Sequence, residues 1–95
     1  MFASEILEQA IHNIQGKAVE RDQPNGERTI PTVVRIFESA TGIKMTPTQG
    51  WLFMLCVNIA RSQAGCYVPN DYADMAAYAS LMGEEESLSP HNKPF

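Results

Sequence analysis

Cysteine and histidine are scarce in this 95-residue sequence, which has two of each. Two cysteines are too few for a small domain held together by disulfides, and they fit reduced thiols in a cytoplasmic protein better. A structural zinc site normally takes about four Cys or His ligands at close spacing, and the sequence offers no such group. We therefore expect a cytoplasmic protein with neither a disulfide framework nor a zinc site.

Positive charge and long apolar runs are also scarce. Lys and Arg number 7 against 11 Asp and Glu, and the formal net charge is −4. The basic residues are scattered along the chain, which argues against a nucleic-acid partner. The apolar run Trp51–Val57 is too short to span a bilayer, and the first residues carry no targeting signal, so we expect no membrane partner. A glycine-rich phosphate loop is absent as well.

Apolar residues recur at helical spacing in four stretches. The segment between the first two stretches is a turn by its composition, because Pro24 is followed by Asn25-Gly26. The β-branched residues that begin the second stretch would also suit a strand, but Phe37 and Gly42 extend the pattern of a helix. The expected helices cover residues 4–18, 29–41, 46–65 and 70–83.

Short connections between these stretches imply neighbouring helices that run antiparallel. We therefore predict an all-α protein, a compact bundle of four helices that forms one domain over residues 1–83. Gly83 suits the end of the last helix. Residues 84–95 combine acidic charge with two prolines and little to bury, so we expect them to form a mobile tail.

The stretch 46–65 is the one around which the chain is organised. Thr46, Pro47 and Gln49 have the order of a helix start with a capping box. The following residues, Trp51–Val57, are apolar on every side, and a helix of that kind is normally surrounded by other elements. We therefore expect the third helix to lie at the centre of the bundle.

Two polar residues, Asn58 and Arg61, share one side of this helix with Trp51. An arginine on an apolar stripe needs a partner, and the next helix offers Asp71 and Asp74 in its first turns. One interpretation is a structural ion pair between Arg61 and these aspartates, in which deletion of one partner would cost about 3–5 kcal/mol if the pair is buried.

The alternative interpretation is a polar pocket that binds a ligand. Asp71 and Asp74 are one turn apart, so they could hold Mg²⁺ together with a further carboxylate, while Arg61 contacts a phosphate group. Glu27 is the preferred third carboxylate because it adjoins Arg28 in a polar turn next to a helix start. The alternatives, Glu5 and Glu8, fit a solvated helix face better.

Three segments, DQPNGERT, TGIKMTPTQGWLFMLCVNIARSQAG and NDYADMAAYASL, are similar to a family of small proteins encoded by tailed phages and prophages. That family is described as MazG-like, after the all-α nucleoside triphosphate pyrophosphatases. The resemblance covers roughly residues 4–83. It implies a polar site built from Glu27, Arg28, Arg61, Asp71 and Asp74. We expect Glu27, Arg28, Asn58, Arg61 and Tyr78 to bind the substrate, a nucleotide, and Asp71 and Asp74 to bind the metal ion.

The family carries a lysine at the position of Asn58, and the loss of that charge argues against pyrophosphohydrolase activity. The resemblance as a whole still favours a MazG-like protein that binds or hydrolyses a nucleotide with Mg²⁺ in the host cytoplasm. The alternative is a non-catalytic phage accessory protein that binds a host or phage protein. A homodimer is also expected, because four short helices bury little surface alone.

Overall fold

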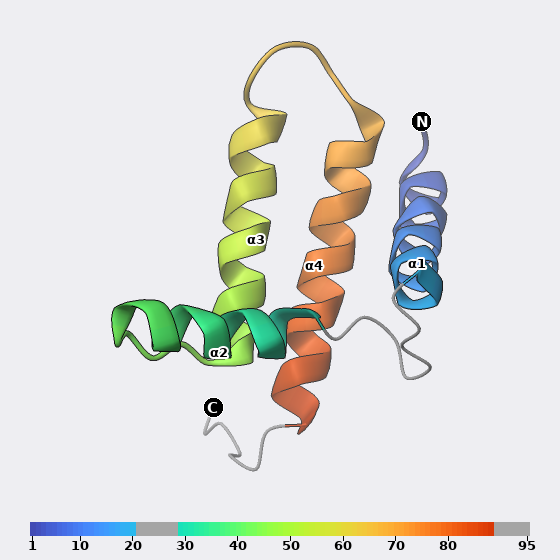
Figure 1. Cartoon of the computed structure of the whole chain (residues 1–95). Helices are drawn as coiled ribbons and strands as arrows, with labels where there is room; N and C mark the ends of the chain where they lie inside the picture. Colours follow the sequence, from blue (N-terminus) through green and yellow to red (C-terminus); the bar gives the residue numbers. More distant parts are fainter. Residues whose placement is uncertain (21–28, 89–95) are drawn as a thin grey trace, which may run out of the picture.

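The computed structural model describes residues 1–20 and 29–88, of which residues 17–20 are described by their backbone alone. The described residues form four helices and no strand, which confirms the predicted all-α class (Figure 1). Their bounds are α1, Ala3–Glu20; α2, Thr29–Thr41; α3, Pro47–Ser62; and α4, Pro69–Leu88.

Local signals set the start of α3 and the end of α2. The Thr46 hydroxyl accepts a hydrogen bond from the Gln49 N–H at 3.1 Å, and the Gln49 side chain accepts one from the Thr46 N–H at 2.9 Å. This capping box satisfies two backbone donors that the helix cannot pair internally. Gly42 follows the last residue of α2 with φ +75°, a conformation that favours glycine.

The helices form a layer with one crossing helix. Helix α4 lies between α1 and α3, and α2 crosses the first turns of α3 (Figure 1). Within the described part of the chain, the backbones of α1 and α3 do not approach each other, and the backbone of α2 approaches only that of α3. The side chains of Ile30 and Val34 also belong to the core cluster that includes Leu81 of α4. As a result, one side of α3 is covered by α4, and only the start of α3 receives a second neighbour.

The core is small and consists of two clusters. One lies where α2, α3 and α4 meet, and the other lies between α1 and α4. The first cluster of buried residues is built from Ile30, Val34, Trp51 and Leu81, with Met54 and Tyr78 at its edge. The second joins α1 to α4 through the alanines Ala10, Ala73 and Ala77, whose small side chains allow the two backbones to approach closely. The side chains of Ile30 and Val34 pack directly over Gly50, which has no side chain of its own.

Three expectations from the sequence are corrected. Gly83 does not end the last helix, because α4 continues to Leu88 and takes in the first five residues, 84–88, of the expected tail. Residues 89–95 lie outside the described part of the chain. The sequence also favours Asn70 as the cap of the last helix, but α4 starts at Pro69, whose fixed φ suits the first helical position, so Asn70 lies inside the helix.

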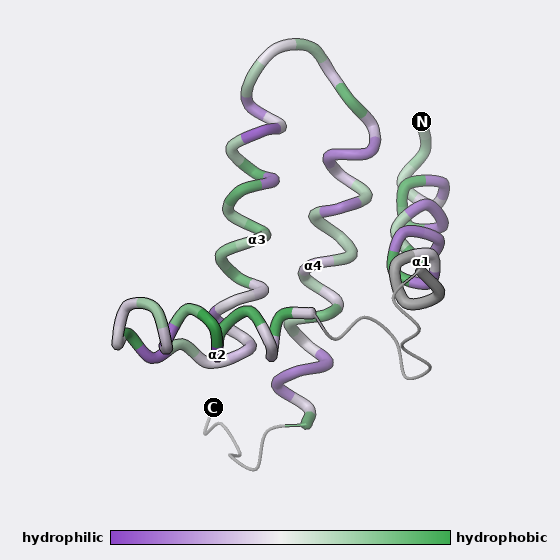
Figure 2. The backbone as a smooth tube through the Cα atoms, viewed as in Figure 1, coloured by the Kyte–Doolittle hydropathy of each residue, from purple (hydrophilic) through white to green (hydrophobic). Residues whose placement is uncertain are grey.

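The third correction concerns α3, which is not surrounded on all sides. The side of α3 away from α4 is apolar but exposed, and Figure 2 shows hydrophobic colour along most of this helix. We call this side the outer face. It is formed by Leu52, Phe53, Cys56, Ile59 and Ala60.

None of the described helices combines the length and the apolar character that a membrane crossing requires.

Candidate functional site

The side of α3 that faces α4 carries two buried polar groups. Asn58 is only 2% exposed, and Trp51, two turns earlier on the same side, is 3% exposed. Within the described residues, neither the Asn58 Nδ2 nor the Trp51 Nε1 has a hydrogen-bond acceptor. A buried donor without an acceptor costs about 1–3 kcal/mol, so the burial of Asn58 calls for a physical explanation.

Trp51 lies against Tyr78 of α4. Their ring centroids are 5.7 Å apart with an angle of 31° between the planes. The contact joins α3 to α4 at the level of the first core cluster, and it makes Tyr78 part of the wall of the α3–α4 interface. Tyr78, which the resemblance assigns to substrate binding, therefore lies on the same interface as Asn58.

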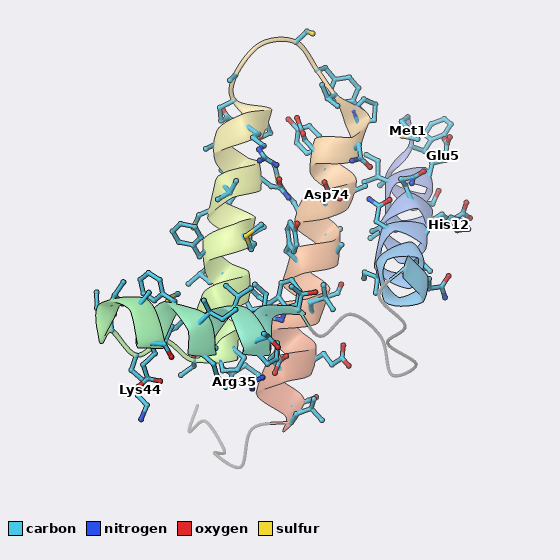
Figure 3. The ribbon with its side chains drawn as sticks, viewed as in Figure 1. Met1, Glu5, His12, Arg35, Lys44 and Asp74 are labelled. Carbon is cyan, nitrogen blue, oxygen red and sulfur yellow. The ribbon has the colours of Figure 1, made fainter. Side chains whose placement is uncertain are left out.

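Asp74 belongs to an amide network that joins α1 to α4. Its two carboxylate oxygens accept hydrogen bonds from the Asn13 amide at 2.9 Å and from the Asn70 amide at 3.3 Å. Asn13 also donates to the Asn70 side-chain oxygen at 3.1 Å and accepts from the Gln9 amide at 2.9 Å. The carboxylate of Asp74 (labelled in Figure 3) is thus tied to α1 by the hydrogen bond from Asn13.

The expected ion pair of Arg61 with the aspartates is not formed. Within the described residues, Arg61 has no ion pair or hydrogen bond with Asp71 or Asp74, and its side chain is exposed. The physical reason is its place in the last turn of α3, where the side chain reaches water and the positive charge suits the helix dipole. The folded state therefore pays no free-energy cost for burying the charge of Arg61. The Arg61 side chain is free to contact a ligand.

The acidic residues of the expected metal site are only partly brought together. Asp71 lies in the first turn of α4, one turn from Asp74 on the same helix. Among residues 1–20 and 29–88, no group of three His, Cys, Asp or Glu side chains could hold a metal ion. Glu27, the preferred third carboxylate, and Arg28 lie outside the described residues.

The start of α2 lies far from the end of α3 that carries Arg61. The first turn of α2 is anchored where Ile30 packs on Gly50. Arg61 is eleven residues further along α3, which corresponds to roughly 16 Å along the helix axis. Figure 3 likewise shows the labelled cations Arg35 and Lys44 at the opposite end of the molecule from Asp74. Arg61 is thus the cation that lies with the aspartates at the α3–α4 connection.

The sequence reasoning missed the role of Asn13 and Asn70. Asn13 falls on the polar side of α1, which suggests contact with solvent, and Asn70 has the composition of a helix cap. Their hydrogen bonds join residues far apart in the sequence, and neither the spacing nor the composition carries a signal for such a contact. His12, the residue before Asn13, is exposed and points away from α4 (Figure 3).

Comparisons of the chain with protein-family models, with curated proteins and with solved structures found no match.

Proposed function

We propose that this protein is a MazG-like helical phage protein that binds the phosphate groups of a nucleotide between the ends of α3 and α4. The observation that carries the proposal is Asn58, a fully buried amide whose Nδ2 has no acceptor among the described residues. A leucine of similar size would fill this position without that cost. Buried polar groups without partners are rare, and a bound ligand is one of the explanations of such a group.

Arg61 supplies the charge for this site. It lies three residues after Asn58, about one helical turn, and its side chain is exposed beside the connection between α3 and α4. Guanidinium groups bind phosphate through two parallel hydrogen bonds, which fixes the orientation of the phosphate. A phosphate that approaches from the α3–α4 connection meets Arg61 first, and the amide of Asn58 lies one turn deeper.

Mg²⁺ completes the proposed site as the partner of the phosphates. This ion is commonly held by one or two carboxylates together with phosphate oxygens and water. Asp71, in the first turn of α4, is the carboxylate that supplies this role, because both oxygens of Asp74 already accept hydrogen bonds. We propose that the site binds a nucleotide. Whether it also hydrolyses a nucleoside triphosphate to a monophosphate and pyrophosphate is tested separately below.

A second candidate is a non-catalytic accessory protein that binds another protein. The observation that favours it is an exposed aromatic group at the α3–α4 connection, where Tyr67 and Tyr72 stack with ring centroids 5.8 Å apart beside the exposed Val68. Tyrosines are enriched at the centres of protein interfaces. The nucleotide titration separates the two candidates, because the second predicts no response to nucleotide.

We expect deoxynucleoside triphosphates with Mg²⁺ to raise the melting temperature of the protein. Binding of the folded state alone adds about 2.7 kcal/mol to the free energy of unfolding at a ligand concentration one hundred times Kd. Arg61→Met should weaken binding at least about tenfold, since a hydrogen bond to a charged group contributes about 1.5–3 kcal/mol. Its melting temperature without nucleotide should not change, because Arg61 has no ion pair with Asp71 or Asp74.

Arg35→Met is the matched control for this experiment. Arg35 is exposed on α2 and donates a hydrogen bond to Thr32 within its own helix, so its loss should leave nucleotide binding unchanged. Calorimetry measures Kd, and an assay of released pyrophosphate reports hydrolysis. Equal weakening by the two substitutions would mean that nucleotides bind by unspecific charge, and the absence of any nucleotide response would refute the proposal.

A further inference from the structure

Asn13 is the residue of α1 that reaches the polar start of α4. Its side-chain N–H groups donate to the Asp74 carboxylate at 2.9 Å and to the Asn70 oxygen at 3.1 Å, and its oxygen accepts from the Gln9 amide at 2.9 Å. A reversed amide would place the Asn13 oxygen against two other acceptors. The side chain is also half-buried, so this network fixes a single orientation of the Asn13 amide.

Asp74 receives only uncharged donors in the described part of the chain. Its carboxylate accepts from the amides of Asn13 and Asn70, and no described Lys or Arg forms an ion pair with it. An ionised carboxylate has about four acceptor positions, and these two hydrogen bonds occupy about half of them. Asp74 is therefore held in place while it can still accept further hydrogen bonds.

The docking of α1 does not by itself require a charge at this position. An asparagine would also offer Asn13 an oxygen acceptor, and the contact between α1 and α4 already has an apolar part in its alanine cluster. Asp74 lies one turn after Asp71, beyond the first turn of α4, so repulsion between the two carboxylates is not offset by the helix dipole. The charge of Asp74 thus calls for a role besides docking.

Helical geometry places Asp74 on the same side of the α3–α4 pair as Arg61. Ile30 of α2 packs on Gly50 of α3 and belongs to one core cluster with Leu81 of α4, so this is the side that α2 crosses. Arg61 is eleven residues after Gly50, and Asp74 is seven residues before Leu81. At about 100° of rotation per residue, both separations return to within about 20° of the starting direction. Arg61 and Asp74 therefore face the same side, nearer to the α3–α4 connection than α2.

We infer that Asn13 is a positioning residue, which holds the Asp74 carboxylate so that it accepts hydrogen bonds from water bound to the Mg²⁺ of the proposed site. The inference rests on the proposed function, in which Asp71 is the carboxylate that contacts Mg²⁺. Protein-bound Mg²⁺ usually keeps several water molecules, which need acceptors of this kind. Through Asn13, helix α1 becomes part of the nucleotide site.

The test is the affinity for a deoxynucleoside triphosphate with and without Mg²⁺, measured by calorimetry well below the unfolding temperature. We expect Asn13→Ala to weaken binding about tenfold with Mg²⁺, as for other residues that orient a metal site from outside, and to leave binding in EDTA unchanged. The same substitution in an Asp74→Ala background should have no further effect, because Asn13 acts through Asp74. A purely structural Asn13 would change both affinities equally.

Ile6→Ala is the matched control for the docking of α1. Ile6 packs on the same alanine cluster and does not hydrogen-bond Asp74, so its loss should lower the melting temperature and leave the Mg²⁺ dependence of binding unchanged. Equal weakening by Ile6→Ala and Asn13→Ala, or wild-type affinity of Asn13→Ala, would overturn the inference and leave the proposed function standing. A wild type without Mg²⁺-dependent nucleotide binding would refute both.

Discussion

Replacement of Trp51 by alanine is expected to lower the free energy of unfolding by about 3–5 kcal/mol, as for other large buried side chains. Trp51 is 3% exposed and is the largest side chain in the cluster that joins α2, α3 and α4. A domain of this size has about 5–15 kcal/mol of stability in total. The substitution should therefore remove a large part of the folded population, as measured by urea unfolding followed by circular dichroism.

Trp51→Phe is the control that separates packing from hydrogen bonding. Phenylalanine keeps an aromatic ring against Tyr78 and removes the Trp51 Nε1 donor, which has no acceptor among the described residues. We expect the loss of stability to be less than about 1.5 kcal/mol. The smaller ring weakens the packing, but the removal of a buried donor without an acceptor offsets part of that loss. Equal losses for the alanine and phenylalanine variants would contradict the packing role that we assign to Trp51.

Replacement of Gly50 by leucine should separate α2 from α3. A Cβ at this position would lie 2.6 Å from the Ile30 Cγ2 and 3.0 Å from the Val34 Cγ1, so even an alanine forces these side chains to move. Overpacking of this kind costs about 1–3 kcal/mol. Because α3 is the only described helix whose backbone α2 approaches closely, we expect the amides of α2 to lose hydrogen-exchange protection while those of α3 and α4 keep it.

Gly83→Ala is the matched control for Gly50. A Cβ at Gly83 would meet no described atom within 4 Å, and the residue lies inside α4. Alanine in a helix interior is favoured over glycine by roughly 0.5–1 kcal/mol, so this variant should be more stable than the wild type. Hydrogen exchange of α2 that is unchanged in Gly50→Leu would show that the contact between Gly50 and Ile30 does not hold α2 in place.

The helix bounds could be predicted where a local signal sets them. Thr46 and Gln49 form the expected capping box, and Gly42 follows α2 with a positive φ. Gly83 was misleading because glycine ends a helix only where the backbone turns left-handed, and α4 has no such turn there. The glutamates that follow it are good helix formers, so the chain continues as a helix to Leu88.

The arrangement of the helices was less predictable, above all for α3. Its residues are apolar on every side, so periodicity cannot tell which side faces α4 and which is left open. The same limit applies to the candidate site. Asn58 was correctly singled out as a polar residue on the stripe of Trp51, but Arg61 escapes burial because it lies in the last turn, and Asp74 turns to Asn13 of α1.

Calorimetric titration and thermal unfolding of an Asn58→Leu variant test the central claim most directly. The claim is that Asn58 is kept for ligand binding at the expense of stability. We predict that the variant is more stable than the wild type by about 1–2 kcal/mol, because a buried donor without a partner is removed, and that it binds nucleotide at least about tenfold more weakly. A less stable variant with unchanged nucleotide binding would contradict the claim.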